Sequence, residues 1–123
     1  MSEKLSLDRI DEIMRLVFLQ LKAMGGRANS KDVMRAVEPK LGLTDDEKEK
    51  THTGSVRWDA YVRFYTSDCV RAGYLDKSEG YWILTPKGED ALKLKPGELI
   101  RSAGREYRKW ASREISRDTR KAS

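Results

Sequence analysis

Apolar residues recur at helical spacing near the start of the chain, where they predict a helix from about Leu7 to Met24. Ser6 or Asp8 caps its start, and the glycines at positions 25 and 26 stop it. The apolar arc of this helix is wider than one stripe, so we expect it to be covered on more than one side. The apolar arc could be buried by the other helices and the tail of the same chain, or by a second copy of the protein in a dimer.

A second helix starts at Asn29 or Ser30 and ends at Gly42. Pro39 removes a backbone donor and is expected to bend or restart this helix near Val37. A short charged helix follows in the segment LTDDEKEK, because a threonine stands three residues before a glutamate there, the reciprocal capping-box spacing.

A third helix is predicted from about Ser55 to Ala72, with Gly73 as its stop. Its core stripe consists of residues spaced by three and four: Trp58, Val62, Tyr65, Cys69 and Ala72. The opposite face carries polar and basic residues, with two aromatics at its borders: Arg57, Arg63, Ser67 and Arg71, then Tyr61 and Phe64.

Two short strands are predicted in YLDKSEGYWIL, around a turn at residues 77–80. Thr85 followed by Pro86 opens a helix to about Leu94, and Lys95–Gly97 breaks the chain before a last helix from 98 to about 117. This order is that of a winged helix-turn-helix. We therefore expect a mainly α fold with a small β-hairpin (α+β) and an additional C-terminal helix. The winged-helix domain would span residues 1–96 and a basic amphipathic helix or linker residues 97–123.

The length of 123 residues and the composition limit the number of domains and the class of protein. It is large enough for one compact core but not for a separate catalytic domain as well. No apolar run is long enough to span a membrane, and the N-terminus does not resemble a signal peptide, so we expect a soluble, cytoplasmic protein. The only cysteine, Cys69, and the only histidine, His52, exclude a disulfide framework and a zinc site within one chain, and no cofactor is expected. We interpret Cys69 as a buried small hydrophobe.

The formal net charge of +5 is concentrated in the last helix, so it says little about the main domain. Basic residues recur there at every fourth position: Arg101, Arg105, Lys109, Arg113, Arg117 and Lys121. The same helix has an apolar face made of Leu99, Ile100, Ala103, Tyr107, Trp110 and Ala111. We favour packing on the domain plus a linker role for this helix, over dimerisation or direct DNA contact.

The segment FYTSDCVRAGYLDKSEGYWILTPKGEDAL, with LGLTDDE and RWDAYVRF before it, resembles the N-terminal winged-helix domain of Mrr-type modification-dependent restriction endonucleases. The positions that carry the resemblance are Phe64, Arg71 to Leu75, Ile83, Thr85 and Gly88. The resemblance implies a domain that reads DNA, in particular methylated DNA, and that a nuclease domain normally follows. Triplets such as Glu38-Pro39-Lys40 lack the strand and aspartate of a nuclease metal site. We expect no catalysis by this chain, and a nuclease would be a fused or associated domain.

Duplex DNA is the expected partner, approached through the third helix. Arg57 and Arg63 are the first candidates for base-edge or phosphate contacts, because arginine presents a planar fork to guanine or phosphate. The other candidate contact residues are Ser67, Thr66, Arg71, Thr53, Ser55, Lys87, Lys31 and Arg27. The hairpin carries Asp76, Lys77 and Glu79, so it is more acidic than a phosphate-touching wing usually is.

The sequence is also compatible with two other functions. One is a stand-alone transcriptional regulator that forms a homodimer through the first and last helices. The other is a winged helix retained for protein–protein interaction, which an acidic wing and a nearly neutral main domain would suit.

Overall fold

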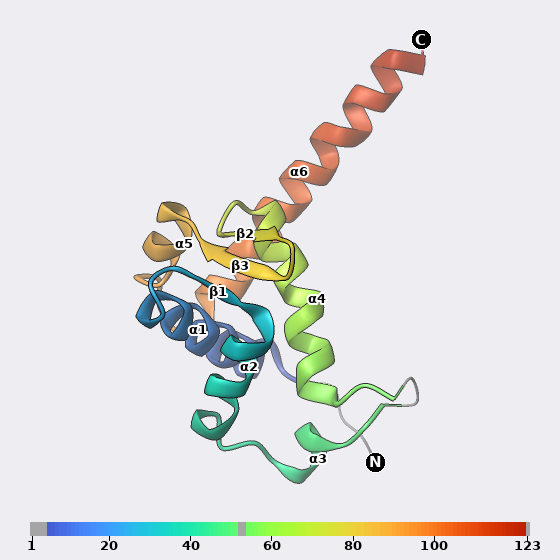
Figure 1. The fold of residues 1–123 in the computed structure, drawn as a ribbon. Helices are drawn as coiled ribbons and strands as arrows, with labels where there is room; N and C mark the ends of the chain where they lie inside the picture. Colours follow the sequence, from blue (N-terminus) through green and yellow to red (C-terminus); the bar gives the residue numbers. More distant parts are fainter. Residues whose placement is uncertain (1–4, 52–53, 123) are drawn as a thin grey trace.

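The computed structural model describes residues 5–51 and 54–122 (Figure 1). The elements follow in the order α1 (Leu7–Ala23), β1 (Arg27–Asn29), α2 (Ser30–Val37), a 3-10 turn η1 (Glu38–Lys40), α3 (Asp45–Lys48), α4 (Arg57–Arg71), β2 (Leu75–Ser78), β3 (Tyr81–Leu84), α5 (Pro86–Ala91) and α6 (Glu98–Ala122). The strands form an antiparallel sheet in the order β1-β3-β2. The protein is thus mainly helical with a small sheet, in a winged-helix arrangement, as the sequence predicted.

The core lies between α1, the sheet, α4 and the start of α6 (Figure 1). The wide apolar arc of α1 is covered within the chain, because this helix packs against α2, α4, α6 and the sheet. Phe18, Val17 and Leu21 of α1 are fully buried. Leu19 remains on the outside, half exposed.

The sheet contains a strand that the sequence did not predict. The segment Arg27–Asn29 adds to the free edge of β3, with Ala28 opposite Trp82. The β2–β3 turn is tighter than expected: it consists of Glu79 and Gly80, both at positive φ. Such a turn joins two strands with the twist that a hairpin requires. The wing is therefore short.

Several local predictions are confirmed. The second helix ends at Val37 and Pro39 lies in the 3-10 turn that follows, as expected from the missing donor. Thr44 and Glu47 form the capping box of α3. Gly88 in α5 lies so close to the carbonyl of Tyr74 that any Cβ atom would clash with it, which explains the glycine in LTPKG.

The last helix is part of the same core. Leu99, Ile100 and Ala103 are buried where this helix packs against α1 and α4, whereas the division expected after residue 96 stays a prediction. Asp11 of α1, almost fully buried, accepts hydrogen bonds from the backbone N–H groups of Gly97 and Ile100 and thereby caps α6 from another helix. The C-terminal part of α6 projects beyond the body of the protein (Figure 1). In the described part of the chain, no helix is long and apolar enough to cross a membrane.

Candidate nucleic-acid interface

The exposed side of α4 is the surface on which a winged helix would present its recognition residues. The inner side of the helix is buried through Trp58, Val62, Thr66 and Cys69. Tyr65, which the sequence placed in the core stripe, is only partly buried. The side opposite the core carries Ala60, Arg63, Phe64 and Ser67, and we call these four residues the outer face of α4.

Phe64 is the most unusual member of this face, because 65% of its surface is exposed. Its ring meets Tyr65 edge to face, with 5.2 Å between ring centroids. Ala60, Tyr61, Phe64 and Tyr65 together line a shallow, mainly apolar hollow of about 280 Å³. The sequence placed Phe64 only at the border of the polar face, whereas the structure places it on the surface.

Arg63 is exposed and forms a weak ion pair on the surface of α4. Its Nε donates to a carboxylate oxygen of Asp59 at 2.8 Å, one turn earlier on the same helix. Exposed pairs at this spacing contribute only about 0.3–0.5 kcal/mol. The guanidinium group can therefore leave Asp59 for a base or a phosphate at little cost.

Arg57, the other first candidate, is held in place by α3. Its side chain is 13% exposed and lies within 4 Å of the carboxylates of Asp46 and Glu49. Its Nε also donates to the backbone carbonyl of Asp46, and its backbone N–H donates to that of Glu49. The structure thus assigns Arg57 first of all to joining α3 with the start of α4.

The helix α3 is itself tied to α1 by a partly buried ion pair. Arg9 donates through two nitrogens to the two carboxylate oxygens of Glu47, at 2.7 and 2.9 Å, and also to the carbonyl of Leu41. Glu47 in turn accepts from the backbone N–H of Thr44. The hydrogen bonds from Arg9 hold the pKa of Glu47 below its usual value. No local sequence pattern indicates this pair, because its members lie in separate helices.

One predicted contact is wrong. Thr66 is fully buried, and its hydroxyl donates back to the carbonyls of Val62 and Arg63, so it cannot reach a phosphate. Ser67, its neighbour, lies on the outer face with a hydroxyl only 3.5 Å from the carbonyl of Arg63. Ser55 is exposed but precedes α4, which begins at Arg57, two residues later than expected. Thr53 and His52 lie outside the described residues.

Positive charge gathers where α4 meets the hairpin. Partial burial lowers the pKa of Lys77, and the neighbouring guanidinium groups of Arg63 and Arg71 lower it further. The wing is acidic in sequence, but this lysine therefore lies among cations of α4. A phosphate placed there would relieve the repulsion between the three groups.

Arg71 has a second role at the end of α4. Its guanidinium carbon lies 5.0 Å from the ring centroid of Trp110 and 5.6 Å from that of Tyr107, both on α6. Such cation–π contacts contribute about 0.5–1 kcal/mol at exposed sites. Arg71 thus connects the candidate recognition helix to α6.

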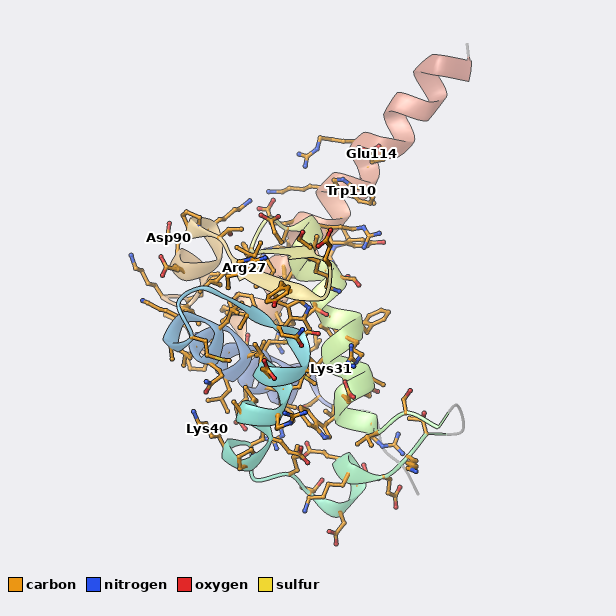
Figure 2. The ribbon with its side chains drawn as sticks, in the orientation of Figure 1. Arg27, Lys31, Lys40, Asp90, Trp110 and Glu114 are labelled. Atoms are coloured by element: carbon orange, nitrogen blue, oxygen red, sulfur yellow. The ribbon has the colours of Figure 1, made fainter. Side chains whose placement is uncertain are left out.

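The remaining predicted residues lie around this face rather than in it. Lys31 is exposed in the first turn of α2, and Figure 2 shows it on the side of α2 that lies toward α4. Arg27 lies over the ring of Tyr81 on the outer surface of the sheet. Lys87 lies 3.9 Å from Glu106 of α6.

Cys69 is fully buried, and this burial raises the pKa of its thiol, which confirms its interpretation as a small hydrophobe. Within the described ranges, no group of histidine, cysteine or carboxylate side chains is arranged to hold a metal ion.

The fold and this surface define a winged-helix domain in which one side of α4 is exposed. Residues 11–94 match the family model of the Mrr N-terminal domain. This match covers more than half of the chain, so the protein belongs to that family, which associates it with Mrr-type restriction systems. Searches of curated proteins and of solved structures gave no match.

Proposed function

We propose that this protein is a duplex DNA-binding module of a restriction system, which inserts α4 into the major groove and reads methylated bases there. The observation that carries the proposal is the outer face of α4, where a lightly bound Arg63 stands beside an exposed Phe64. A helix of this width fits the major groove of B-form DNA. Lys77 from the hairpin and Lys31 from α2 would then lie near the two sugar-phosphate backbones that border the groove.

The two central residues suit different groups of a base pair. The guanidinium of Arg63 can pair with O6 and N7 of guanine or with a phosphate, at a gain of about 1–3 kcal/mol for a bidentate base contact. The ring of Phe64 offers an apolar surface to the C5-methyl group that thymine and 5-methylcytosine present in the major groove. Contact between the exposed ring and such a methyl group would remove apolar surface from water, which would favour binding.

Duplexes that differ only in methyl groups test the proposal. Affinity is measured by fluorescence anisotropy for duplexes containing thymine or uracil, and cytosine or 5-methylcytosine, at fixed salt. Loss of the contacted methyl group should weaken binding about fourfold, the equivalent of roughly 0.8 kcal/mol. Phe64→Ala should remove this preference and keep binding to the unmethylated duplex.

Leu19→Ala is the matched control, because Leu19 is another half-exposed apolar residue but belongs to α1 and not to the outer face of α4. It should leave both affinity and methyl preference unchanged. If the unchanged protein binds none of these duplexes at low salt, the DNA-binding proposal fails. If it binds all of them equally, only the reading of C5-methyl groups fails.

The hollow beside Phe64 also favours a second candidate, a winged helix that docks another protein. A contiguous apolar patch made of Ala60, Tyr61, Phe64 and Tyr65 is a feature of interaction surfaces. The homodimer expected through the first and last helices stays a prediction, although these two helices bury apolar surface against each other within one chain. A titration with duplex DNA followed by amide NMR separates the candidates, since shifts absent from residues 57–71 favour protein docking.

A further inference from the structure

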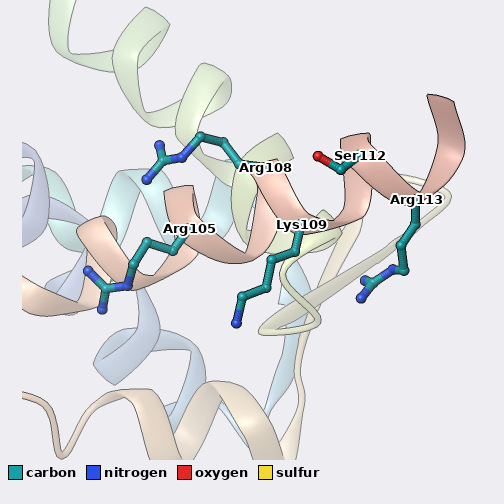
Figure 3. Close-up of a pocket in the computed structure, with 5 residues that line it drawn as sticks. All are labelled: Arg105, Arg108, Lys109, Ser112 and Arg113. Carbon is teal, nitrogen blue, oxygen red and sulfur yellow. The ribbon is translucent and has the colours of Figure 1, made fainter. Parts of the chain in front are cut away.

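The part of α6 beyond its packed first turns carries a strongly basic surface. Four cations surround Ser112 and line an open hollow of about 520 Å³, and we call them the basic face of α6: Arg105, Arg108, Lys109 and Arg113. Figure 3 shows Arg105, Lys109 and Arg113 extending to one side of the helix and Arg108 to another. This surface lies outside the residues that match the family.

These cations are only partly neutralised by their own chain. Arg105 lies 3.8 Å from Glu98, and Lys109 lies 3.7 Å from Glu106. Both pairs are exposed and weak. Among the residues that the structure describes, neither Arg108 nor Arg113 forms an ion pair. The basic face therefore has positive charge available for an anionic partner.

The basic face is continuous with the apolar patch of α4. A groove of about 370 Å³ runs between α4 and α6, and Tyr65, Asp68, Arg101, Arg105 and Arg108 are among the residues that line it. Tyr65 also lines the hollow beside Phe64, while Arg105 and Arg108 also belong to the basic face. Partial burial raises the pKa of Asp68, the acidic residue in the groove, although Arg71 opposes this shift.

The packing of α6 fixes this arrangement. Buried Leu99 and Ala103 anchor its first turns, and the contact of Arg71 with Trp110 extends the attachment toward the basic face. The position of the basic face relative to α4 is therefore built into the fold, so its cations do not have to be ordered at the moment of binding.

From this placement we infer that the basic face of α6 binds backbone phosphates of the same duplex whose major groove receives α4. The inference rests on the proposed function. Phosphate-bearing backbones border the major groove, and α6 lies alongside α4 at one of its sides. Residues four apart on a helix rise about 6 Å, so Arg105, Lys109 and Arg113 span about 12 Å, which lets them contact successive phosphates of one strand. Charge complementarity selects phosphate as the ligand.

The salt dependence of binding tests the inference. Affinity for a duplex of about 20 base pairs is measured at several salt concentrations for the unchanged chain and for the triple variant Arg105→Gln, Lys109→Gln and Arg113→Gln. Each lost phosphate contact lowers the slope of log affinity against log salt by about 0.9. We expect the slope to fall by about 2 to 3 and the affinity at moderate salt to fall at least about tenfold.

A second triple variant, Lys22→Gln, Lys93→Gln and Lys95→Gln, is the matched control. It removes the same net charge from exposed lysines near α5, away from the groove between α4 and α6. Its slope should change by less than about 1. Circular dichroism confirms that both variants keep their helix content.

Three results would overturn the inference and leave the proposed function intact. The first is an equal change in slope for the two variants, which would reflect net charge alone. The second is an unchanged slope for the α6 variant. The third is that the α6 variant loses affinity for single-stranded DNA, measured in the same way, but keeps its affinity for the duplex. The basic face would then be a site for single strands. In contrast, failure of the unchanged chain to bind any duplex would defeat the proposed function itself.

Discussion

Arg57 and Arg63 belong to the same helix, but their surroundings make them different kinds of residue. Arg57 at the start of α4 is mostly buried against the carboxylate and carbonyl of Asp46 in α3 and the carboxylate of Glu49, which follows α3. Arg63 in the middle of α4 is exposed, and within the described ranges its ion-pair partner is Asp59 of its own helix. The first joins two elements, whereas the second is free to exchange its partner. Their common positive charge is thus a poor guide to what each one does.

The difference divides the molecule into an anchored region and an open one. The anchored region comprises α3, the start of α4 and the Arg9–Glu47 pair, in which polar groups satisfy one another. The open region is the outer face of α4, where polar groups are weakly engaged and an aromatic ring is exposed. Substitutions in the first should change stability, and substitutions in the second should change binding.

The largest effect is expected in the anchored region, from Glu47→Ala. The change leaves the guanidinium of Arg9 partly buried without its bidentate partner and removes the return bond to the N–H of Thr44. We expect the free energy of unfolding to fall by about 1–3 kcal/mol, the cost of leaving a partly buried charged group without its hydrogen-bond partner. Urea denaturation measures it. Glu12→Ala is the control, because Glu12 also contacts Arg9 but is exposed, so its loss should cost less than about 1 kcal/mol.

The same carboxylate predicts a dependence of stability on pH. The pKa of Glu47 is lower in the folded state than its usual value of 4.5, because Arg9 donates hydrogen bonds to the carboxylate. The folded state therefore gains stability from the ionised form at pH above 4.5 and loses it as the pH falls through the lower, folded pKa. Denaturation curves between pH 7 and pH 3 should show this loss in the unchanged chain and less of it in Glu47→Ala. Equal loss in both would show that other groups dominate.

The next effect compares the two arginines directly. Arg57→Ala should lower the free energy of unfolding by about 1–2 kcal/mol, because it removes the hydrogen bond to the carbonyl of Asp46 and the guanidinium that the carboxylates of Asp46 and Glu49 both contact. Arg63→Ala should change stability by less than about 0.5 kcal/mol, but weaken duplex binding by about 1–3 kcal/mol if the residue reads a base. Unfolding curves and anisotropy titrations of both variants give the four values. A stable Arg57→Ala protein with a binding defect would reverse the assignment.

The open region was partly predictable from the sequence. The spacing of Trp58, Val62 and Cys69 indicated the buried side of α4, and Gly73 with the alternation after it indicated the hairpin. The same helical spacing places Phe64 away from the core. The sequence could not show that Tyr65 would share a groove with α6, because that contact depends on how two distant helices pack.

The anchored region was much less predictable. The capping box of α3 was recognisable because its residues are three apart, whereas the pairing of Arg9 with Glu47 and the capping of α6 by Asp11 join residues far apart in the chain. The strand β1 was missed because its three residues are too few for an alternating pattern and their partner is β3. Local patterns therefore predicted most of the helices and strands. Contacts between distant residues determine which polar side chains are available for binding.

The smallest effect compares two neighbouring hydroxyl groups of α4. Thr66→Val replaces a buried hydroxyl that bonds only to carbonyls of its own helix, so stability should change by about 1 kcal/mol or less and duplex affinity by less than twofold. Ser67→Ala should leave stability unchanged or slightly higher, because alanine favours helices, yet weaken binding about two- to fivefold if its hydroxyl donates to a phosphate. Two residues that are adjacent in sequence would then affect different properties. If Thr66→Val weakens binding more than Ser67→Ala does, the separation of anchored and open positions does not hold within α4.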